Sequence, residues 1–141
     1  MKKLTQAQKI DAIYDMLIVK TKTIGLPFET YPTNLPVMTY VDAVKAVEAI
    51  NRKLKKGEPQ WHIPTLEEAR LQYKNKDEIG GFITEDSGSD YPYSYWSSTP
   101  DRDYPTYVVN VRFSDGLEYW NHKDNFRLSC RPVRLAAAPA L

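Results

Sequence analysis

The spacing of apolar residues changes once along the chain, near Gly80, and this change limits the folds that the chain can adopt. Before Gly80, apolar side chains recur at helical spacing in segments that begin with cap-like threonines at Thr5, Thr39 and Thr65. After Gly80 the helical spacing disappears, and the stretches 106–113 and 125–135 have the composition of strands. Helices followed by strands predict an α+β fold, because a parallel α/β fold requires the two kinds of element to alternate.

Shorter patterns predict where several of these elements begin and end. Thr65 and Glu68 have the spacing of a capping box, so a short helix is expected to begin near Leu66. Ser114-Asp115-Gly116 predicts a hairpin turn, in which Asp-Gly supplies the positive φ angles of a tight turn. Pro132 lies inside the closing strand, which favours an edge position or a bulge there.

The length of 141 residues suits one domain with a core of its own. We expect an N-terminal helix and linker over residues 1–34, a single domain over 35–135, and a disordered tail over 136–141. The tail reads AAAPAL and carries no packing pattern.

Charge and composition exclude several classes of partner. The net charge is only +1. The segment from Glu85 to Asp103 holds five acids and one arginine, and its negative charge repels phosphate backbones and argues against a nucleic-acid partner. No apolar run approaches the ~20 residues of a membrane helix, so no membrane insertion is expected. Polar residues interrupt the apolar part of the N-terminus, so no signal peptide is predicted and the location is expected to be cytoplasmic or a virion. Cys130 is the only cysteine, which excludes an intrachain disulfide.

Short motifs along the chain resemble those of a known family. They are MTYVDAVKAV (38–47), WHIPTLEE (61–68), YWSST (95–99), VNVRFSDG (109–116) and CRPVR (130–134). Together they resemble the bacterial domain family found at the C-terminus of the Legionella collagen-like adhesin. Its members carry W-R-L-P-T-x-x-E-L, then Y-W-S-S, then F-S-(D/N)-G and an arginine-rich closing strand. The resemblance covers roughly residues 35–135, and His62 replaces the family's usual arginine.

This resemblance implies a fold related to the C-type lectin-like domains. Formylglycine-generating enzymes and variable receptor-binding proteins of phages share that fold. It consists of a small, twisted antiparallel sheet with two flanking helices and long loops exposed on one side. The resemblance also implies that Trp61 and Trp96, which belong to family motifs, form part of the core. Cys130 is assigned to the core as a small buried residue of the closing strand.

The richest concentration of aromatic residues is the stretch YPYSYWSSTPDRDYPTYVVNV (91–111). Alternate residues of a strand face opposite sides, so Tyr91, Tyr93 and Tyr95 are expected to share one face and Trp96 the other. Tyrosine suits a binding surface, because it offers a large contact area and a polar tip with few rotamers to freeze. The alternative is that these rings only cover a small sheet. The candidate ligand-binding residues are Tyr91, Tyr93, Tyr95, Asp101, Arg102, Asp103, Tyr104, Tyr107, Tyr119, Trp120 and His122.

No metal site is predicted, and calcium is kept as an alternative. Asp86 and Asp90 flank a glycine and offer oxygen ligands, but their spacing is not that of an EF-hand loop. The sugar-binding C-type lectins hold calcium through E-P-N or Q-P-D and W-N-D tripeptides. The chain lacks the first two and has W-N-H in place of the third.

The sequence therefore favours a non-enzymatic recognition domain. Its loops 86–105 and 117–125 would contact a host surface protein or glycan, or other virion proteins. The setting we expect is a phage or prophage virion component, such as a tail, fibre or head-decoration protein, because virion proteins need no signal peptide. One alternative is an adhesin-type glycan-binding domain without its leader, which would be extracellular. Another is a structural capsid or homo-oligomer component. A formylglycine-generating type of enzyme is disfavoured, since such enzymes use a pair of cysteines.

Overall fold

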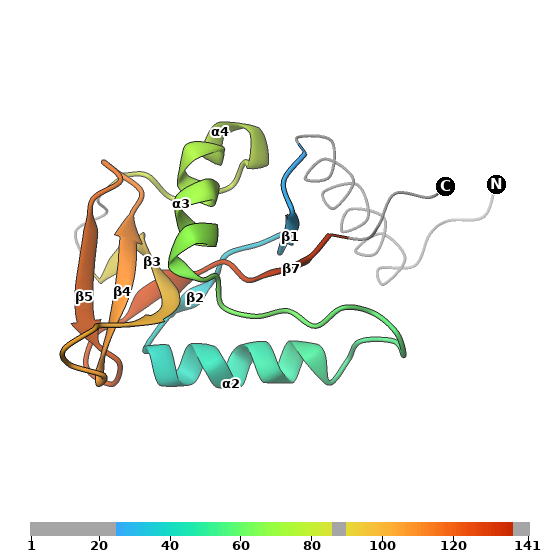
Figure 1. The fold of residues 1–141 in the computed structure, drawn as a ribbon, viewed down its shortest axis with the longest axis horizontal. Coiled ribbons are helices and arrows are strands. Elements are labelled where there is room, and N and C mark those ends of the chain that lie inside the picture. The colour runs from blue at the N-terminus through green and yellow to red at the C-terminus, as the bar shows by residue number, and fades with distance from the viewer. Residues whose placement is uncertain (1–24, 86–89, 137–141) are drawn as a thin grey trace.

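The computed structural model describes residues 25–85 and 90–136. The expected N-terminal helix before Gly25, the metal candidate Asp86 and the tail from residue 137 onward lie outside these ranges. The described chain is α+β, as the sequence predicted, although two of its strands, at 28–30 and 35–38, precede its first helix (Figure 1). Its elements are β1 (Phe28–Thr30), β2 (Leu35–Met38), α2 (Tyr40–Asn51), α3 (Leu66–Lys74), α4 (Lys76–Ile79), β3 (Tyr91–Pro100), β4 (Tyr107–Arg112), β5 (Glu118–His122), β6 (Leu128–Cys130) and β7 (Val133–Leu135).

The main sheet has five strands in the order β2-β6-β3-β4-β5. The strands β3, β4 and β5 form an antiparallel meander, which Figure 1 shows at one end of the molecule. β6 lies between β2 and β3, antiparallel to β2 but parallel to β3. The expected antiparallel sheet is confirmed for the other pairings and is wrong for the pairing of β3 with β6. The physical reason is the connection after β5, which carries the chain back past β3 instead of adding a further strand at the β5 edge.

A second, two-stranded sheet joins the two ends of the described chain. β1 pairs with β7 in antiparallel register, with Phe28 opposite Leu135 and Thr30 opposite Val133. Phe28, Glu29 and Thr30 are all buried. Residues 28–34, which the sequence analysis assigned to an N-terminal linker, thus lie within the folded domain.

The predicted hairpin between the strands β4 and β5 is present, but its turn differs in detail. Gly116 has a positive φ of 80°, whereas Asp115 does not share it. The Asp115 carboxylate instead accepts a hydrogen bond from the Leu117 amide at 3.0 Å. The closing strand is interrupted as the proline suggested, because Arg131 and Pro132 separate β6 from β7.

The helices α2 and α3 begin at the positions that the sequence predicted. Thr39 caps α2 by accepting a hydrogen bond from the Asp42 amide. Thr65 and Glu68 form the predicted capping box at the start of α3, with each side chain bonded to the other residue's backbone amide.

The two helices cover opposite faces of the main sheet. Ala43 and Val47 of α2 pack in one cluster with Trp96, and Ala69 of α3 packs in a second cluster with Tyr95. Tyr95 and Trp96 are neighbours in β3, and neighbouring residues of a strand point to opposite faces. Trp61, Trp96 and Cys130, the residues that the sequence assigned to the interior, all lie in the cluster beneath α2.

Candidate functional site

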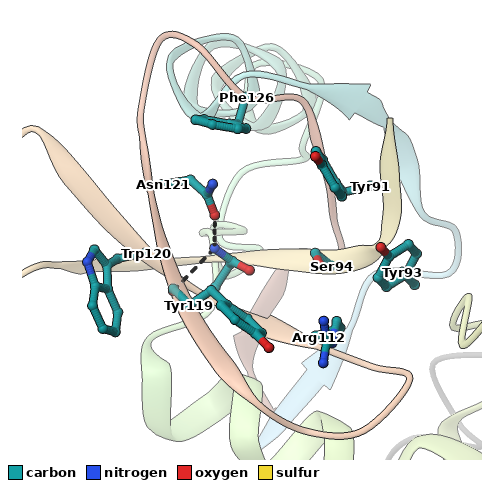
Figure 2. Close-up of a pocket in the computed structure, with 9 residues that line it drawn as sticks. Tyr91, Tyr93, Ser94, Arg112, Tyr119, Trp120, Asn121 and Phe126 are labelled. Carbon is teal, nitrogen blue, oxygen red and sulfur yellow. Dashed lines mark hydrogen bonds between the residues drawn. The ribbon is translucent and has the colours of Figure 1, made fainter. Parts of the chain in front are cut away.

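A groove of about 230 Å³ opens over the strands β3, β4 and β5 and the segment that leads into β6 (Figure 2). Asn110 is the cross-strand partner of both Trp96 and Tyr119, and Ser94 is the partner of Arg112. Partners in adjacent strands share a face, so the groove continues the face that α2 covers further along. The residues that line it are Tyr91, Tyr93, Ser94, Asn110, Arg112, Tyr119, Trp120, Asn121 and Phe126.

The floor of the groove is polar and held in place by Asn110. This side chain is only 1% exposed, and its amide nitrogen donates to Asn121 Oδ1 at 2.6 Å and to the Tyr119 carbonyl at 3.2 Å. Figure 2 marks these two hydrogen bonds with dashed lines. These hydrogen bonds connect β5 to β4, so Asn110 fixes the position of the Asn121 side chain.

Arg112 is the charged residue among those that line the groove, and it forms an ion pair with Asp115. Its guanidinium donates from Nε to both carboxylate oxygens of Asp115, at 3.0 and 3.1 Å, and from Nη2 to Oδ2. The hydrogen bonds from Arg112 hold the pKa of Asp115 below its usual value, and those same bonds raise the pKa of Arg112. The guanidinium carbon also lies 4.8 Å from the centre of the Tyr119 ring.

Aromatic rings form the walls. Tyr91 lies edge-on to Tyr93 with ring centres 6.4 Å apart, and Phe126 lies 6.4 Å from Tyr91 on its other side. Figure 2 shows Phe126 and Tyr91 on one side of β3 and Tyr119 with Arg112 on the other. Tyr91, Tyr119 and Phe126 are 46%, 39% and 36% exposed, so much of their ring surface is open to a ligand.

Trp120 is the most exposed tryptophan in the described chain, at 59%. Tyr119 and Trp120 are both candidate ligand-binding residues from the sequence, and the structure exposes both. Because adjacent residues of a strand alternate in direction, Trp120 points away from Tyr119, as Figure 2 shows. Trp120 therefore forms a rim at the β5 edge.

A second group of aromatic residues lies on the other face of the hairpin. Tyr107 is the cross-strand partner of His122, with ring centres 5.5 Å apart, and Tyr104 packs on Tyr107 at 6.1 Å. Asp101 accepts hydrogen bonds from the Asp103 and Tyr104 amides and so shapes the loop that carries Tyr104. Arg102 and Asp103 are exposed in that loop. The candidate residues thus divide between two surfaces.

Tyr95 does not belong to either surface, and its assignment to a solvent-facing row with Tyr91 and Tyr93 is wrong. It is 1% exposed and packs on Phe113 and Phe82 beneath α3. The alternation assumed for residues 91–95 fails because the register of β3 against β6 shifts between Tyr91 and Tyr95. The expected loops 86–105 and 117–125 also contain two strands, β3 and β5, so most of the candidate residues stand on sheet.

Five residues that line the groove were not among the candidates from the sequence: Ser94, Asn110, Arg112, Asn121 and Phe126. A signal for two of them was present, because Asn110 and Arg112 alternate with Val109 and Val111. Polar residues at every second position indicate the open side of a strand. Phe126 follows the last turn of the meander and carries no such pattern.

Metal-ligating side chains do not gather in the described ranges, where no three His, Cys, Asp or Glu residues lie close enough to hold an ion. Asp90 is exposed at the start of β3, and Asp86 lies outside the described residues. Among residues 25–85 and 90–136, no helix has both the length and the apolarity to cross a membrane.

The fold and the groove define a class of protein, a small α+β domain that presents an aromatic and polar groove from its main sheet. A comparison with family profiles then gives the particular family. The profile described as the Lcl C-terminal domain matches residues 18–134, and the chain belongs to this family. The matched range includes β1, and the pairing of β1 with β7 likewise makes that strand part of the domain. No curated protein matches the chain.

Proposed function

We propose that the chain is a non-enzymatic recognition domain of the adhesin type, which binds a molecule on a host cell surface through the groove. The observation that carries this proposal is the exposure of Tyr91, Tyr119, Trp120 and Phe126 around a fixed polar floor. Exposed aromatic rings grouped in this way are typical of contact surfaces, since they bury a large area with few rotamers to freeze. Membership of the Lcl C-terminal domain family supports the same class.

The proposal includes a relationship of the fold to the C-type lectin-like domains. Two features support it. The first and last described strands pair with each other, and one helix lies on each face of the main sheet. In such an arrangement the helices and the paired ends hold the sheet, and the far strands are free to carry a binding surface.

A catalytic role of the formylglycine-generating type is disfavoured by the state of the single thiol. Cys130 is fully buried, and burial raises its pKa to about 12. The thiolate is the nucleophile and metal ligand in cysteine chemistry, so a thiol with this pKa is poorly suited to either task.

The biological setting stays a prediction. A virion component and a bacterial surface protein would both use an exposed recognition groove. A structural capsid or oligomer component would instead bury the groove between copies of the chain. Sedimentation or light scattering separates these cases, because a monomer in solution leaves the groove open and a stable oligomer allows it to be covered.

The groove itself is tested by binding of the fluorescently labelled protein to host cells or bacteria. We expect Tyr91→Ala and Tyr119→Ala to weaken binding, whereas the matched control Tyr104→Ala, an exposed tyrosine on the other face of the hairpin, should bind as the parent does. Circular dichroism and thermal melting verify that each variant folds. If only Tyr104→Ala loses binding, the ligand contacts the second aromatic group and the groove assignment is overturned.

A further inference from the structure

We propose that a second copy of the chain pairs with the free edge of β5, so that two main sheets join in antiparallel register about a two-fold axis at Trp120. This inference goes beyond the proposed function, because it does not depend on what the groove binds. It is carried by the regular pairing of β5, the direction of its free backbone groups and the order of its side chains.

The two edges of the main sheet differ in how well they are protected. β2 forms one edge, and it carries Pro36 and a shift of register against β6, two features that discourage further pairing. β5 forms the other edge, where no other described strand pairs with its outer side (Figure 1). It contains neither proline nor lysine, and its pairing with β4 runs without a shift from Glu118 to His122. The β5 edge is therefore the one that is open to a further strand.

The backbone groups that point to this edge follow from the hydrogen bonds at the two ends of the hairpin. The Arg112 amide donates to the Leu117 carbonyl at 2.8 Å, and the Lys123 amide donates to the Thr106 carbonyl at 3.0 Å. In an antiparallel ladder, residues bonded to one neighbour alternate with residues whose N–H and C=O groups face the other way. The residues of β5 that direct their backbone groups outward are therefore Glu118, Trp120 and His122.

These three residues have an order that matches its own reverse. An antiparallel copy centred on the axis brings Trp120 opposite Trp120 of the second copy, and Glu118 opposite His122 of the second copy, twice by symmetry. This register uses all three outward residues of each strand, whereas a shift by two residues would use only two. A strand of another protein would also satisfy the backbone groups, but the second copy is favoured because its side chains match as well.

The polar side chains that would meet across the axis are an acceptor and a donor. Glu118 accepts hydrogen bonds from Arg70 at 2.6 and 2.8 Å, and these bonds hold the pKa of its carboxyl below the usual value. Its carboxylate oxygens can each accept a further bond. His122 accepts a hydrogen bond from the Asp124 amide on Nδ1 at 3.1 Å, which leaves the Nε2–H of the neutral ring as a donor.

Trp120 supplies the apolar part of the interface. Glu118 is the cross-strand partner of Val111, which packs in one cluster with α3, and Trp120 follows two residues later on the same face of the strand. The indole is 59% exposed in the single chain. At the axis the two indoles would lie directly opposite each other and shield one another from water, and aromatic pairs at such positions stabilise antiparallel sheets.

The pairing leaves the groove open. Tyr119 and Asn121 line the groove and lie on the face of β5 opposite to Trp120. The two-fold axis of an antiparallel pair runs perpendicular to the sheet, so both grooves would open on the same side of the joined sheet. Two grooves on one side can contact one cell surface together, and the first contact raises the effective concentration for the second.

The test is sedimentation equilibrium of the full chain over a range of concentrations, with two charge variants. We expect a reversible monomer–dimer equilibrium for the parent. Glu118→Lys places a lysine opposite His122, and His122→Glu places a glutamate opposite Glu118. Each variant alone should dimerise about tenfold more weakly, since every substitution acts twice at the axis. An equal mixture should form a heterodimer of about the parent's affinity, because the new lysine then meets the new glutamate.

Two further variants separate edge pairing from other kinds of association. Trp120→Lys places like charges opposite each other at the axis and should remove the dimer. Tyr91→Ala is the matched control, an exposed groove tyrosine on β3, and should dimerise as the parent does. Circular dichroism and thermal melting verify that each variant folds. Hydrogen exchange of the Trp120 amide should slow as the concentration of the parent rises, since that amide becomes bonded only in the dimer.

The possible results each decide the inference. A parent that is monomeric at every concentration overturns it and leaves the groove proposal in place. A dimer that Trp120→Lys and both charge variants retain also overturns it and indicates contacts elsewhere in the chain. Folded charge variants that stay monomeric when mixed contradict the antiparallel register. Recovery of the dimer in the mixture alone supports it, because only this register brings the two new charges together.

Discussion

Glu29 and Arg134 lie directly opposite each other in the two-stranded sheet and form a buried ion pair, with Arg134 Nε 2.9 Å from Glu29 Oε2. Their side chains are 3% and 10% exposed. Arg134 also reaches Glu58 at 3.5 Å and lies 4.4 Å from the centre of the Trp61 ring. One arginine thus joins β1, β7 and the segment that carries the core residue Trp61, so the closure of the domain depends on it.

Glu29→Gln is expected to lower the free energy of unfolding by about 3 kcal/mol, because it leaves Arg134 partly desolvated without its main counter-charge. The remaining contact with Glu58 is longer and more exposed, which places the expected loss at the lower end for a broken buried pair. Urea unfolding followed by tryptophan fluorescence measures the change.

The control is the same substitution in an exposed ion pair. Glu118→Gln removes the partner of Arg70, whose side chain is 52% exposed, and exposed pairs contribute less than about 1 kcal/mol. Equal losses in the two variants would show that the Glu29 pair is no more important than a surface contact.

Gly116→Ala tests the packing of the hairpin turn against α3. A Cβ built at Gly116 lies 2.5 Å from Cε1 of Tyr73, and the φ of 80° is itself unfavourable for a residue with a side chain. We expect a loss of about 1–2 kcal/mol from the backbone and a further ~1–3 kcal/mol from the clash. Thermal melting and urea unfolding give the total.

Gly57→Ala separates these two contributions. Gly57 has a similar φ of 89°, but a Cβ there has no atom within 4 Å. This variant should therefore lose only the backbone part. If Gly116→Ala is no worse than Gly57→Ala, the turn moves freely away from Tyr73 and the hairpin is not fixed by α3.

The features that the sequence predicted correctly depend on residues close together in the chain. Thr39 and Thr65 cap helices because their side chains reach backbone amides three residues away. The hairpin turn at Gly116 is equally local. Such patterns can be recognised in a sequence because the chain itself holds the interacting groups close together, independently of the rest of the fold.

The features that it missed depend on partners distant in sequence. Glu29 pairs with Arg134 more than a hundred residues away, and β6 inserts beside β3 in parallel although the strands before it form a meander. The burial of Tyr95 follows from an irregular register between those same strands. Period-2 alternation predicts the direction of a side chain only where the strand is regular, so the groove could be predicted only in part.

Alkaline pH is expected to destabilise the fold through Cys130. Burial raises the pKa of this thiol from 9.0 to about 12, so between these values the unfolded state binds fewer protons than the folded state. Stability from this group is therefore complete below pH 9 and falls as pH rises above it, by about 1 kcal/mol at pH 10. Urea unfolding at pH 8 and about pH 10 measures the fall.

Cys130→Ala serves as the control for this pH dependence, since it removes the thiol and should flatten the curve over the same range. The measurements stop at about pH 10 because two further groups titrate at higher pH. Burial also raises the pKa of Tyr95 to about 12 and lowers that of Arg131 to about 10. At higher pH the titration of Tyr95 lowers the free energy of unfolding, whereas that of Arg131 raises it. If the free energy of unfolding of Cys130→Ala falls with pH as steeply as that of the parent, Cys130 is not the group responsible.

Removal of calcium is expected to leave the melting temperature unchanged. Calcium requires about six to eight oxygen ligands, and the carboxylates near the groove already have other partners. Asp115 is bound by Arg112, and Glu118 accepts from Arg70 Nε at 2.6 Å. Thermal melting with a chelator, with added calcium and with magnesium as control tests this, because an ion that binds only the folded state raises the melting temperature. A rise specific to calcium that Asp90→Asn abolishes would contradict the prediction and place an ion at the start of β3.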